Sequence, residues 1–429
     1  MKQTLKIGLL GLGTVGSGVP KILKENKEKI SQVTGLDIEV SKALVRDQKE
    51  KDLQSQRFDM ALTTEVDEIV SDPEISIVVE LIGKIEPAKT FISKALENGK
   101  HVVTANKDLL AQHGSELAAL AEKNNCDLYY EASVAGGIPI LRTIANSLDA
   151  DDIHKVLGIV NGTTNYMLTK MLSEKKSYQE ALQEAQDLGF AESDPTNDVD
   201  GIDAAYKMVI LSKFAFGMTI NLDQVDKKGI RDITSDDVAI ASQLGYEIKL
   251  IGSSEKSDGG IAVEVAPMLV ANTHPLASVR NEFNAVFVNS SGVGESMYYG
   301  PGAGTMPTAT SVVSDIMSIA KNISQGTAGG RFSEYQQETK LTPNNGIFGK
   351  YYFSIEVTDK PGQLLLLTKL MTEANVSLDQ MLQQKSDGTR AKVVLITHTI
   401  SKEQMLEVTA QIKKVADFEL LNTLKVLEG

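Results

Sequence analysis

Strand and helix patterns alternate over the first third of the chain. Short runs of apolar and β-branched residues predict strands, and these runs are Leu5–Leu10, Ile38–Val45, Ile75–Ile82, His101–Thr104 and Asp127–Glu131. Apolar residues at helical spacing predict helices between them, at Val15–Ile30, Pro87–Asn98 and Asp108–Asn124. This alternation is typical of an α/β fold with a doubly wound parallel sheet. We assign residues 1–133 to such a domain.

The middle of the chain, residues 134–330, shows a mixed pattern. A strand is predicted at Lys155–Val160, and helices are predicted at Tyr166–Ser173, Tyr178–Leu188 and Ile202–Phe216. Long gaps between these segments do not fit regular strand-helix alternation. We therefore interpret this region as an α+β substrate and dimerisation domain.

The last part of the chain reads as a separate unit behind a linker. Residues 331–349 are rich in Ser, Gln, Thr, Pro and Asn and poor in apolar residues, which is linker composition. Residues 350–429 then predict a β-α-β-β-α-β order of ferredoxin-like type: Tyr351–Thr358, Gly362–Ala374, Val376–Gln384, Ala391–Ile400, Lys402–Val415 and Leu420–Val426. We expect this unit to fold independently of the domains before it.

Composition narrows the class of protein. The chain has 429 residues, 42% of them hydrophobic, and a formal charge of −14, so its surface disfavours nucleic acid and anionic membranes as partners. Cys126 is the single cysteine, which excludes an intramolecular disulfide and fits a reducing, cytoplasmic location. We find no signal-peptide pattern and no apolar run of membrane-spanning length. The five histidines are scattered, so a zinc site has no support.

A glycine motif follows the first predicted strand. Gly11 suits a tight turn, Gly13 lets the backbone approach a pyrophosphate, and Gly16 lets the next helix pack closely on the strand. Leu12, Thr14 and Val15 complete this fingerprint. A glycine turn in a generic α/β domain is the alternative, but the position between strand and helix favours a Rossmann-type cofactor site.

The end of the second predicted strand bears on which cofactor is used. Arg46 stands where a guanidinium could bind the 2′-phosphate of NADP(H), which we favour. Asp47 follows directly and could instead accept from the ribose hydroxyl of NAD(H), so this cofactor stays open.

An acidic segment leads into the helix predicted at Ile202–Phe216. Asp203 and Lys207 are four residues apart on one helix face, and Glu192 and Asp198 precede them. Carboxylates could bind the ammonium of an amino-aldehyde, while the lysine donates a proton to the oxygen that gains charge as hydride arrives. A solvated acidic loop with a surface ion pair is the alternative.

Two further segments carry candidate chemistry. Lys107 lies just after a strand's carboxyl end, where open α/β sheets bind ligands, although it could equally be a surface lysine at a helix start. Glu131 begins a glycine-containing stretch up to Pro139 whose carbonyl oxygens could coordinate a monovalent cation. Taken alone, that stretch fits an interdomain hinge better.

Together these motifs resemble the homoserine dehydrogenase family. The resemblance rests on segments in order, up to about Gly330: Gly11–Gly16, Glu80–Gly83, His101–Lys107, Glu131–Pro139, Asn161–Tyr166, Glu192–Lys207 and Gly300–Gly304. It implies reversible NAD(P)-dependent hydride transfer between L-aspartate 4-semialdehyde and L-homoserine, in threonine and methionine biosynthesis.

The resemblance also implies roles for individual residues. Lys207 would donate the proton, with Lys107 beside nicotinamide and substrate, while Glu192, Asp198 and Asp203 would hold homoserine. Sodium would be bound by Glu131 with backbone atoms of Val134, Gly136 and Ile138, and the cofactor would be approached by Thr104, Lys107, Gly189 and Gly304. Lys84 departs from the family, which often has glycine there, and this puts the contacts of its loop in doubt.

The C-terminal unit resembles an ACT domain, with Asp359–Gly362 at the turn into its first helix. The resemblance implies feedback by threonine in a homodimer or homotetramer, although a purely structural dimerisation module is the alternative. Without a kinase-sized N-terminal extension we expect no aspartokinase fusion.

Two other functions were weighed. An aspartate-semialdehyde dehydrogenase needs a thiolate nucleophile, and Cys126 beside Asp127 is a poor one. A sensor that binds cofactor and amino acid without catalysis would have no need of Lys107 and Lys207.

Overall fold

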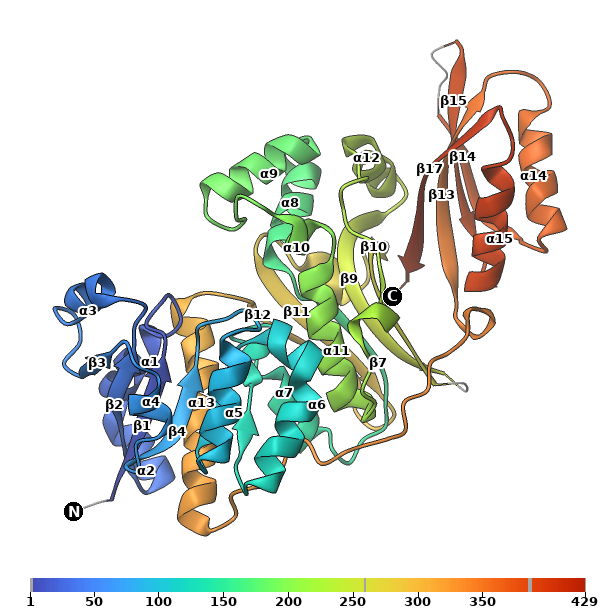
Figure 1. Cartoon of the computed structure of the whole chain (residues 1–429). Coiled ribbons are helices and arrows are strands. Elements are labelled where there is room, and N and C mark those ends of the chain that lie inside the picture. Colours follow the sequence, from blue (N-terminus) through green and yellow to red (C-terminus); the bar gives the residue numbers. More distant parts are fainter. Residues whose placement is uncertain (1–2, 258–259, 385–387, 429) are drawn as a thin grey trace.

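The chain forms an elongated molecule in the computed structural model, which describes residues 3–257, 260–384 and 388–428. The N-terminal domain lies at one end and the C-terminal unit at the other (Figure 1). Between them lie the helices and strands of the middle region, including α11 (Ile202–Phe216).

The first domain is built on a six-stranded parallel sheet. Its strand order is β3-β2-β1-β4-β5-β6, which confirms the predicted doubly wound sheet. The strands are β1 (Thr4–Leu10), β2 (Asp37–Leu44), β3 (Ala61–Thr63), β4 (Ile75–Glu80), β5 (His101–Thr104) and β6 (Leu128–Tyr129). The sequence pattern missed β3 because three residues are too few to show an alternation.

Helices connect these strands: α1 (Gly18–Glu25), α2 (Lys27–Thr34), α3 (Gln48–Gln54), α4 (Asp67–Val70), α5 (Ala88–Glu97) and α6 (Lys107–Lys123). The single helix expected at Val15–Ile30 is two helices. Asn26 interrupts it with φ −111° and ψ 20°, while its N–H still bonds to the carbonyl of Ile22. Apolar spacing continues through this break, so periodicity alone could not reveal it.

A late helix returns to this first domain. Helix α13 (Thr305–Gln325) has buried apolar residues that include Val312, Ile316 and Ile319, and they pack in one cluster with Ile7 and Val19. Figure 1 shows α13 lying among the strands of the N-terminal domain. Helix α13 belongs to the stretch that the sequence analysis assigned to the substrate domain, and its apolar stripe packs on one face of the first sheet.

A second sheet of eleven strands runs through the rest of the molecule, and its main path is β12-β11-β7-β9-β10-β17-β13-β15-β14. The middle region supplies β7 (Ile153–Ile159), β9 (Tyr246–Ser257), β10 (Gly260–Ala271), β11 (Phe283–Ser290) and β12 (Gly294–Pro301), with the short β8 (Asp226–Lys227) beside β10. Its helices are α7 (Ile140–Arg142), α8 (Gly162–Ser173), α9 (Tyr178–Asp187), α10 (Thr196–Val199), α11 (Ile202–Phe216) and α12 (Ser235–Gln243).

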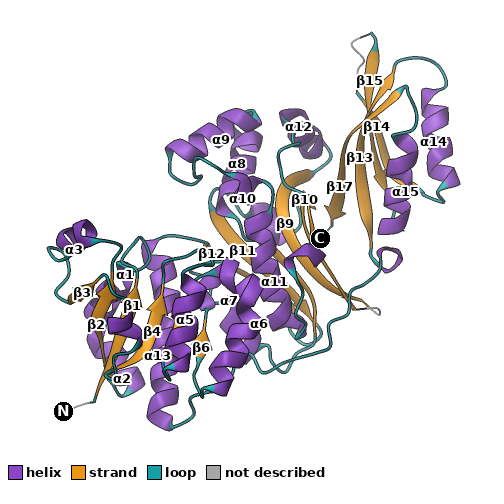
Figure 2. Cartoon of the chain, in the orientation of Figure 1, coloured by secondary structure: helices purple, strands orange, loops and turns teal. Residues whose placement is uncertain are grey.

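The C-terminal unit has the expected ferredoxin-like element order. Its elements are β13 (Phe348–Thr358), α14 (Gln363–Glu373), β14 (Leu378–Gln383), β15 (Arg390–Thr397), β16 (Ile400–Ser401), α15 (Lys402–Ile412) and β17 (Phe418–Leu427). In Figure 2, α14 and α15 lie together on one side of its strands.

This unit is joined to the middle region rather than separate from it. Strand β17 pairs in parallel with β10, where Met268 lies opposite Lys425, and the Lys425 ammonium lies 2.6 Å from a Glu264 oxygen. Tyr352 and Leu424 belong to the same apolar cluster as the buried side chains of α12 and β9. The linker composition predicted an independent unit, but the sheet and its core continue across the linker.

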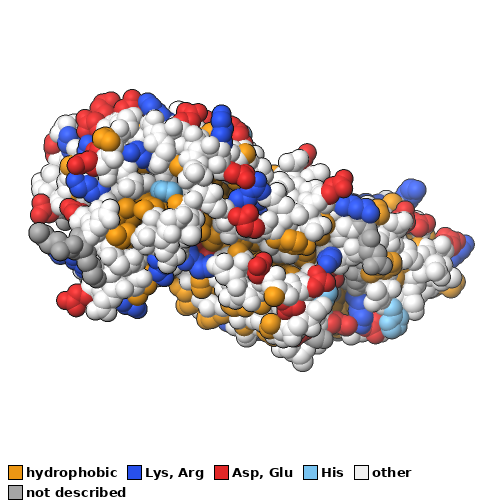
Figure 3. All heavy atoms as spheres, turned by 90° about the horizontal axis from the view of Figure 1, so that it is seen from below, with side chains coloured by type: hydrophobic (Ala, Val, Ile, Leu, Met, Phe, Trp, Pro, Cys, Tyr) orange, Lys and Arg blue, Asp and Glu red, His pale blue; other side chains and the backbone are white. Residues whose placement is uncertain are grey.

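No helix in the described parts of the chain is both long and apolar enough to cross a membrane. On the face drawn in Figure 3, acidic and basic side chains are interspersed, and its described residues form no continuous basic surface.

Candidate active site

The predicted lysine and carboxylate on α11 form a close pair. Gly201 precedes this helix with φ +76°, a conformation that glycine tolerates without strain, and so turns the acidic segment into α11. The Lys207 ammonium donates to Asp203 Oδ2 at 2.8 Å and to the carbonyl of Val160 at 2.5 Å. Both side chains are only 11% exposed, so this is not a solvated surface ion pair.

Lys107 reaches the same carboxylate from the other domain. It is the first residue of α6, and its ammonium lies 3.4 Å from Asp203 Oδ1 and 3.4 Å from Asp108 Oδ1. Burial acts to raise the pKa of Asp203, but the charges of Lys207 and Lys107 outweigh it and lower that pKa. Asp203 therefore stays ionised between two ammonium groups, one from each domain.

The structure adds Asn161, to which the sequence analysis gave no role. Its side-chain amide donates to Asp198 Oδ1 at 2.7 Å and to Asp203 Oδ2 at 2.9 Å. Its oxygen accepts from the N–H of Thr164 at 2.9 Å, so Asn161 also caps α8. An Asn just before a helix is the available sequence signal, but it predicts only the cap and not the link between two carboxylates.

The other acidic residues of the segment differ in whether they contact this cluster. Burial, as the largest effect, raises the pKa of Asp198, and the Asn161 amide opposes it. Glu192 is exposed, and among the described residues no hydrogen bond or ion pair joins its side chain to this cluster. Asp200 pairs with Arg231. The structure thus brings Asp198 and Asp203 together but leaves Glu192 outside.

The glycine loop has the geometry that its sequence predicts. Gly11 has φ +103°, and a Cβ on Gly16 would lie 2.1 Å from the Gly11 carbonyl oxygen. A Cβ on Gly13 would meet no atom within 4 Å, so the space beside Gly13 is open. Leu12 is buried in the core, while Thr14 is exposed and Val15 is half-buried. The loop therefore offers a cradle for a pyrophosphate ahead of α1.

At the end of β2, the side chains of Arg46 and Asp47 differ in whether they are free to bind a cofactor. The Arg46 side chain is 84% exposed. Asp47 caps α3, because its carboxylate accepts from the N–H of Glu50 at 2.8 Å. Arg46 can therefore turn toward a ligand, while Asp47 already serves the fold.

Other residues assigned to the cofactor lie in different settings. The Thr104 hydroxyl is buried and donates to Glu80 Oε2 at 2.6 Å, so its side chain holds strands β4 and β5 together. Gly304 precedes α13, which contacts α1 where Thr305 lies beside Gly18. Gly189 lies beyond α9 with open space around its Cα.

The backbone of Lys84 has the conformation that the glycine common in the family would adopt. It has φ +62°, a left-handed conformation that glycine adopts more readily, and its carbonyl accepts from the Asn106 side chain at 2.6 Å. The loop thus keeps a glycine-like backbone and is tied to the residue before Lys107.

The segment proposed for sodium contains oxygen atoms that are already hydrogen-bonded. The Glu131 carboxylate accepts from the N–H groups of Leu141 and Arg142, and the Gly136 carbonyl accepts from Ser311 at 2.7 Å. Ile138 lies in the same segment, and its carbonyl accepts from the N–H of Ile140. Within the described residues no cluster of three or more His, Cys, Asp or Glu side chains could hold a metal.

The charged groups around this segment are two carboxyls and one guanidinium. Glu131 and Asp315 are both buried, and Arg142 is the cation that pairs with each of them. Burial raises the pKa of both carboxyls, that of Asp315 to about 8, so Asp315 keeps its proton at neutral pH and Glu131 is balanced by Arg142. A hard cation here would be bound mainly by carbonyl oxygens such as that of Val134.

Cys126 is unsuited to nucleophilic chemistry. It is buried, and burial together with the charge of Asp127 raises the pKa of its thiol to about 11. This supports the rejection of a thioester-forming enzyme.

Comparisons with known proteins agree with this geometry. The profile described as homoserine dehydrogenase matches residues 139–317, and its NAD-binding domain profile matches residues 11–131. A homoserine dehydrogenase of Lactococcus lactis is 55% identical, over 99% of this chain and 100% of the relative.

Solved structures show the same likeness. The crystal structure of a homoserine dehydrogenase from Thiobacillus denitrificans superposes with a TM-score of 0.94 at 36% identity, covering 99% of each chain. A hyperthermophilic archaeal homoserine dehydrogenase in complex with NADPH has a TM-score of 0.63 at 28% identity, over 74% of this chain and 98% of that one. With a buried lysine and carboxylate pair at the domain junction, these matches show that the chain belongs to the homoserine dehydrogenase family of NAD(P)-dependent oxidoreductases.

Proposed function

We propose that this enzyme uses Lys207 as the proton donor when it reduces L-aspartate 4-semialdehyde to L-homoserine. The observation that carries this proposal is the buried Lys207–Asp203 pair, with Lys207 also fixed by the Val160 carbonyl. A bound nicotinamide cofactor supplies or accepts the hydride. As the substrate oxygen gains negative charge, Lys207 gives it a proton, and Asp203 stabilises the ammonium group before transfer.

The substrate is held by the charged groups around this pair. Asp198 and Asp203 bind the substrate ammonium, and Lys107, beside both nicotinamide and substrate, neutralises the substrate carboxylate or helps to polarise the carbonyl. Glu192, which is exposed, is a further candidate ligand of the substrate ammonium. This arrangement needs both domains, because Lys107 and Asp203 come from α6 and α11.

For the cofactor we propose NADP(H) ahead of NAD(H). Residues Gly11–Gly16 hold the pyrophosphate, with Gly304 and the backbone at Thr104 nearby and Gly189 approaching from the substrate side. The exposed Arg46 binds the 2′-phosphate, while Asp47 is engaged in capping α3. The archaeal relative solved with NADPH supports this preference.

Sodium, regulation and assembly form a second group of proposals. A sodium ion beside Glu131, bound through the carbonyls of Val134, Gly136 and Ile138, would add to Arg142 in offsetting the charge of Glu131. Residues 350–429 act as an ACT domain that binds threonine, in a cytoplasmic homodimer or homotetramer. Its support is the ferredoxin-like strand order β17-β13-β15-β14.

An assay of semialdehyde reduction with NADPH and NADH side by side tests the activity. Turnover should depend on semialdehyde, and Lys207→Ala should lower kcat by roughly two to four powers of ten with cofactor affinity unchanged. Lys123→Ala, an exposed change on α6, is the matched control. Cofactor binding without turnover in the parent would instead fit a sensor without catalysis.

Threonine titration tests the regulatory part. We expect millimolar threonine to inhibit without competing with homoserine. Competitive inhibition would show that threonine acts in the catalytic site as a homoserine mimic, and no inhibition would leave residues 350–429 with a structural role.

A further inference from the structure

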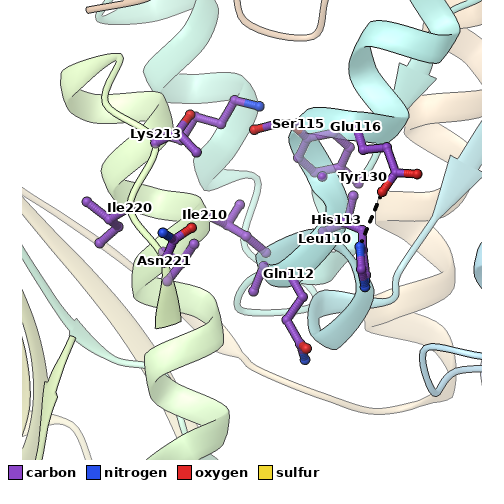
Figure 4. Close-up of a pocket in the computed structure, with 14 residues that line it drawn as sticks. Leu110, Gln112, His113, Ser115, Glu116, Tyr130, Ile210, Lys213, Ile220 and Asn221 are labelled. Carbon is purple, nitrogen blue, oxygen red and sulfur yellow. Dashed lines mark ion pairs between the residues drawn. The ribbon is translucent and has the colours of Figure 1, made fainter. Parts of the chain in front are cut away.

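A cavity of about 270 Å³ lies between α6 and α11, further along both helices than Lys107 and Lys207. Figure 4 shows most of its residues on two helices that face one another, with Leu110 and Ile210 pointing toward the space between them. At 1.5 Å per residue, Ser115 and Lys213 are roughly 9–12 Å along their helices from the catalytic lysines. The cavity is therefore separate from the lysine and carboxylate pair.

Lys213 is the unusual residue of this cavity. Figure 4 shows its side chain extending from α11 toward Ser115 on α6. Its carbonyl accepts from the N–H of Gly217, but among residues 3–257, 260–384 and 388–428 no hydrogen bond or ion pair is formed by its ammonium group. Burial lowers the pKa of Lys213, and the positive charge of Arg331 lowers it further. Lys213 is half-buried, and a partly desolvated ammonium group without a counter-ion favours a nearby anion.

The neighbouring charged groups do not supply that anion. Glu116 lies 2.9 Å from the Lys89 ammonium and 3.4 Å from His113. Glu122 pairs with Arg331 at 2.5 Å, in a second cavity of about 200 Å³ that also reaches Lys213. Both carboxylates therefore have cationic partners. Among the described residues, no carboxylate pairs with the Lys213 ammonium.

We propose that this α6–α11 cavity binds a small organic carboxylate. The ligand's carboxylate accepts from the Lys213 ammonium, and its short apolar body packs against Leu110, Ile210 and Ile220. The volume suits a molecule of the size of an amino acid or short-chain acid. Because α6 begins with Lys107 and α11 carries Asp203, such a ligand contacts both helices that meet at the catalytic site.

Isovalerate and its neutral isostere isovaleramide test the proposal, with binding to the full chain measured by ligand-observed NMR. We expect isovalerate to bind at millimolar concentration. Isovaleramide should bind more weakly by a factor of roughly ten or greater, because it cannot form the charge-assisted hydrogen bond. Homoserine at saturating concentration should not displace isovalerate. Displacement by homoserine would place the probe in the catalytic site and overturn the proposal.

Variants locate the binding site. Lys213→Met keeps the length of the side chain without its charge and should weaken isovalerate binding roughly tenfold or more, whereas Lys213→Arg should retain it. Lys123→Met, an exposed change on α6, controls for general loss of positive charge. A melting temperature for Lys213→Met at or above that of the parent would show that the variant folds. Equal binding of isovalerate by Lys213→Met and the parent, or of both probes by the parent, would contradict the assignment.

Discussion

At the scale of single residues, the active site depends on how Asn161 and three charged side chains share hydrogen bonds. Asp203 accepts from Lys207 and from Asn161, and Asn161 also holds Asp198. Asp203 is buried and Asp198 is half-buried, and their negative charges repel one another. The Asn161 amide donates to both, which favours the ionised form of each carboxylate, the form that binds a substrate ammonium.

The first prediction concerns Asn161→Ala and pH. Burial already raises the pKa of Asp198, and loss of the Asn161 donor should raise it further. Because the ionised form binds the substrate ammonium, activity is present above this pKa and lost as pH falls through it. A hydrogen bond to a charged group contributes about 1.5–3 kcal/mol, so the acid limb of the kcat/KM profile should move upward by about one pH unit or more.

The control for this prediction is Asn146→Ala, an exposed change elsewhere in the middle region. Circular dichroism should accompany the kinetics, since Asn161 also caps α8. An unchanged acid limb in a folded Asn161→Ala variant would mean that Asp198 does not govern substrate binding.

The second prediction concerns Arg46→Ala. The KM for NADPH should rise while that for NADH stays nearly constant, because only NADPH carries the 2′-phosphate that a guanidinium binds. Lys49→Ala removes a positive charge from an exposed site on α3 and serves as the matched control. Equal losses with both cofactors would assign Arg46 to the fold through its contact with Glu50.

At the scale of elements, the turn from β1 into α1 separates two uses of glycine. Gly16 is needed by the fold, because a side chain there would overlap the carbonyl of Gly11. Gly13 has free space around it and is needed only when a ligand approaches. The sequence motif treats both positions alike, and the structure distinguishes them.

The third prediction follows from this difference. Gly13→Ala should fold with a melting temperature near that of the parent and lose cofactor affinity, whereas Gly16→Ala should lose stability as well. Thermal unfolding without cofactor and cofactor titration by fluorescence measure the two effects. Parent-like cofactor affinity in Gly13→Ala would show that the pyrophosphate does not approach this residue.

Elements were predicted well where their pattern is local. Five of the six strands of the first sheet and helices α5, α6, α9 and α11 agree with their predicted positions within a few residues. The break between α1 and α2 and the short β3 were missed, since neither changes the apolar spacing over a full window.

At the scale of the whole molecule, the C-terminal unit stabilises the middle region by sharing its sheet. Strand β17 covers the edge of β10, and Leu424 is buried in the common apolar cluster. Cutting the chain at residue 335 would expose both that edge and that cluster, so such a chain should aggregate or melt earlier. This expectation replaces the independent unit that linker composition suggested.

The fourth prediction tests this coupling in the full chain. Leu424→Ala should lower the free energy of unfolding by about 2–5 kcal/mol, the usual cost of truncating a buried leucine. Leu365→Ala is the matched control, because Leu365 is 75% exposed on α14 and should change stability by less than about 0.5 kcal/mol. If denaturant unfolding showed that Leu424→Ala leaves the stability of the middle region unchanged, the C-terminal unit would fold independently, as the linker composition predicted.

The sequence by itself determined the properties that depend on neighbours a few residues apart. These include the strand and helix alternation, the glycine turn and the helical spacing of Asp203 and Lys207. Hydrogen bonding within helices and the pleat of strands impose these short periods, so they are visible in one chain.

Only the tertiary structure decided which distant residues meet. It brought Lys107 to Asp203, placed Asn161 between two carboxylates, left Glu192 exposed and returned α13 to the first domain. Apolar faces pack on whichever surface closes the core, and local spacing does not specify that partner. The same packing left the Lys213 ammonium without a described partner in a cavity and joined β17 to β10 across the linker.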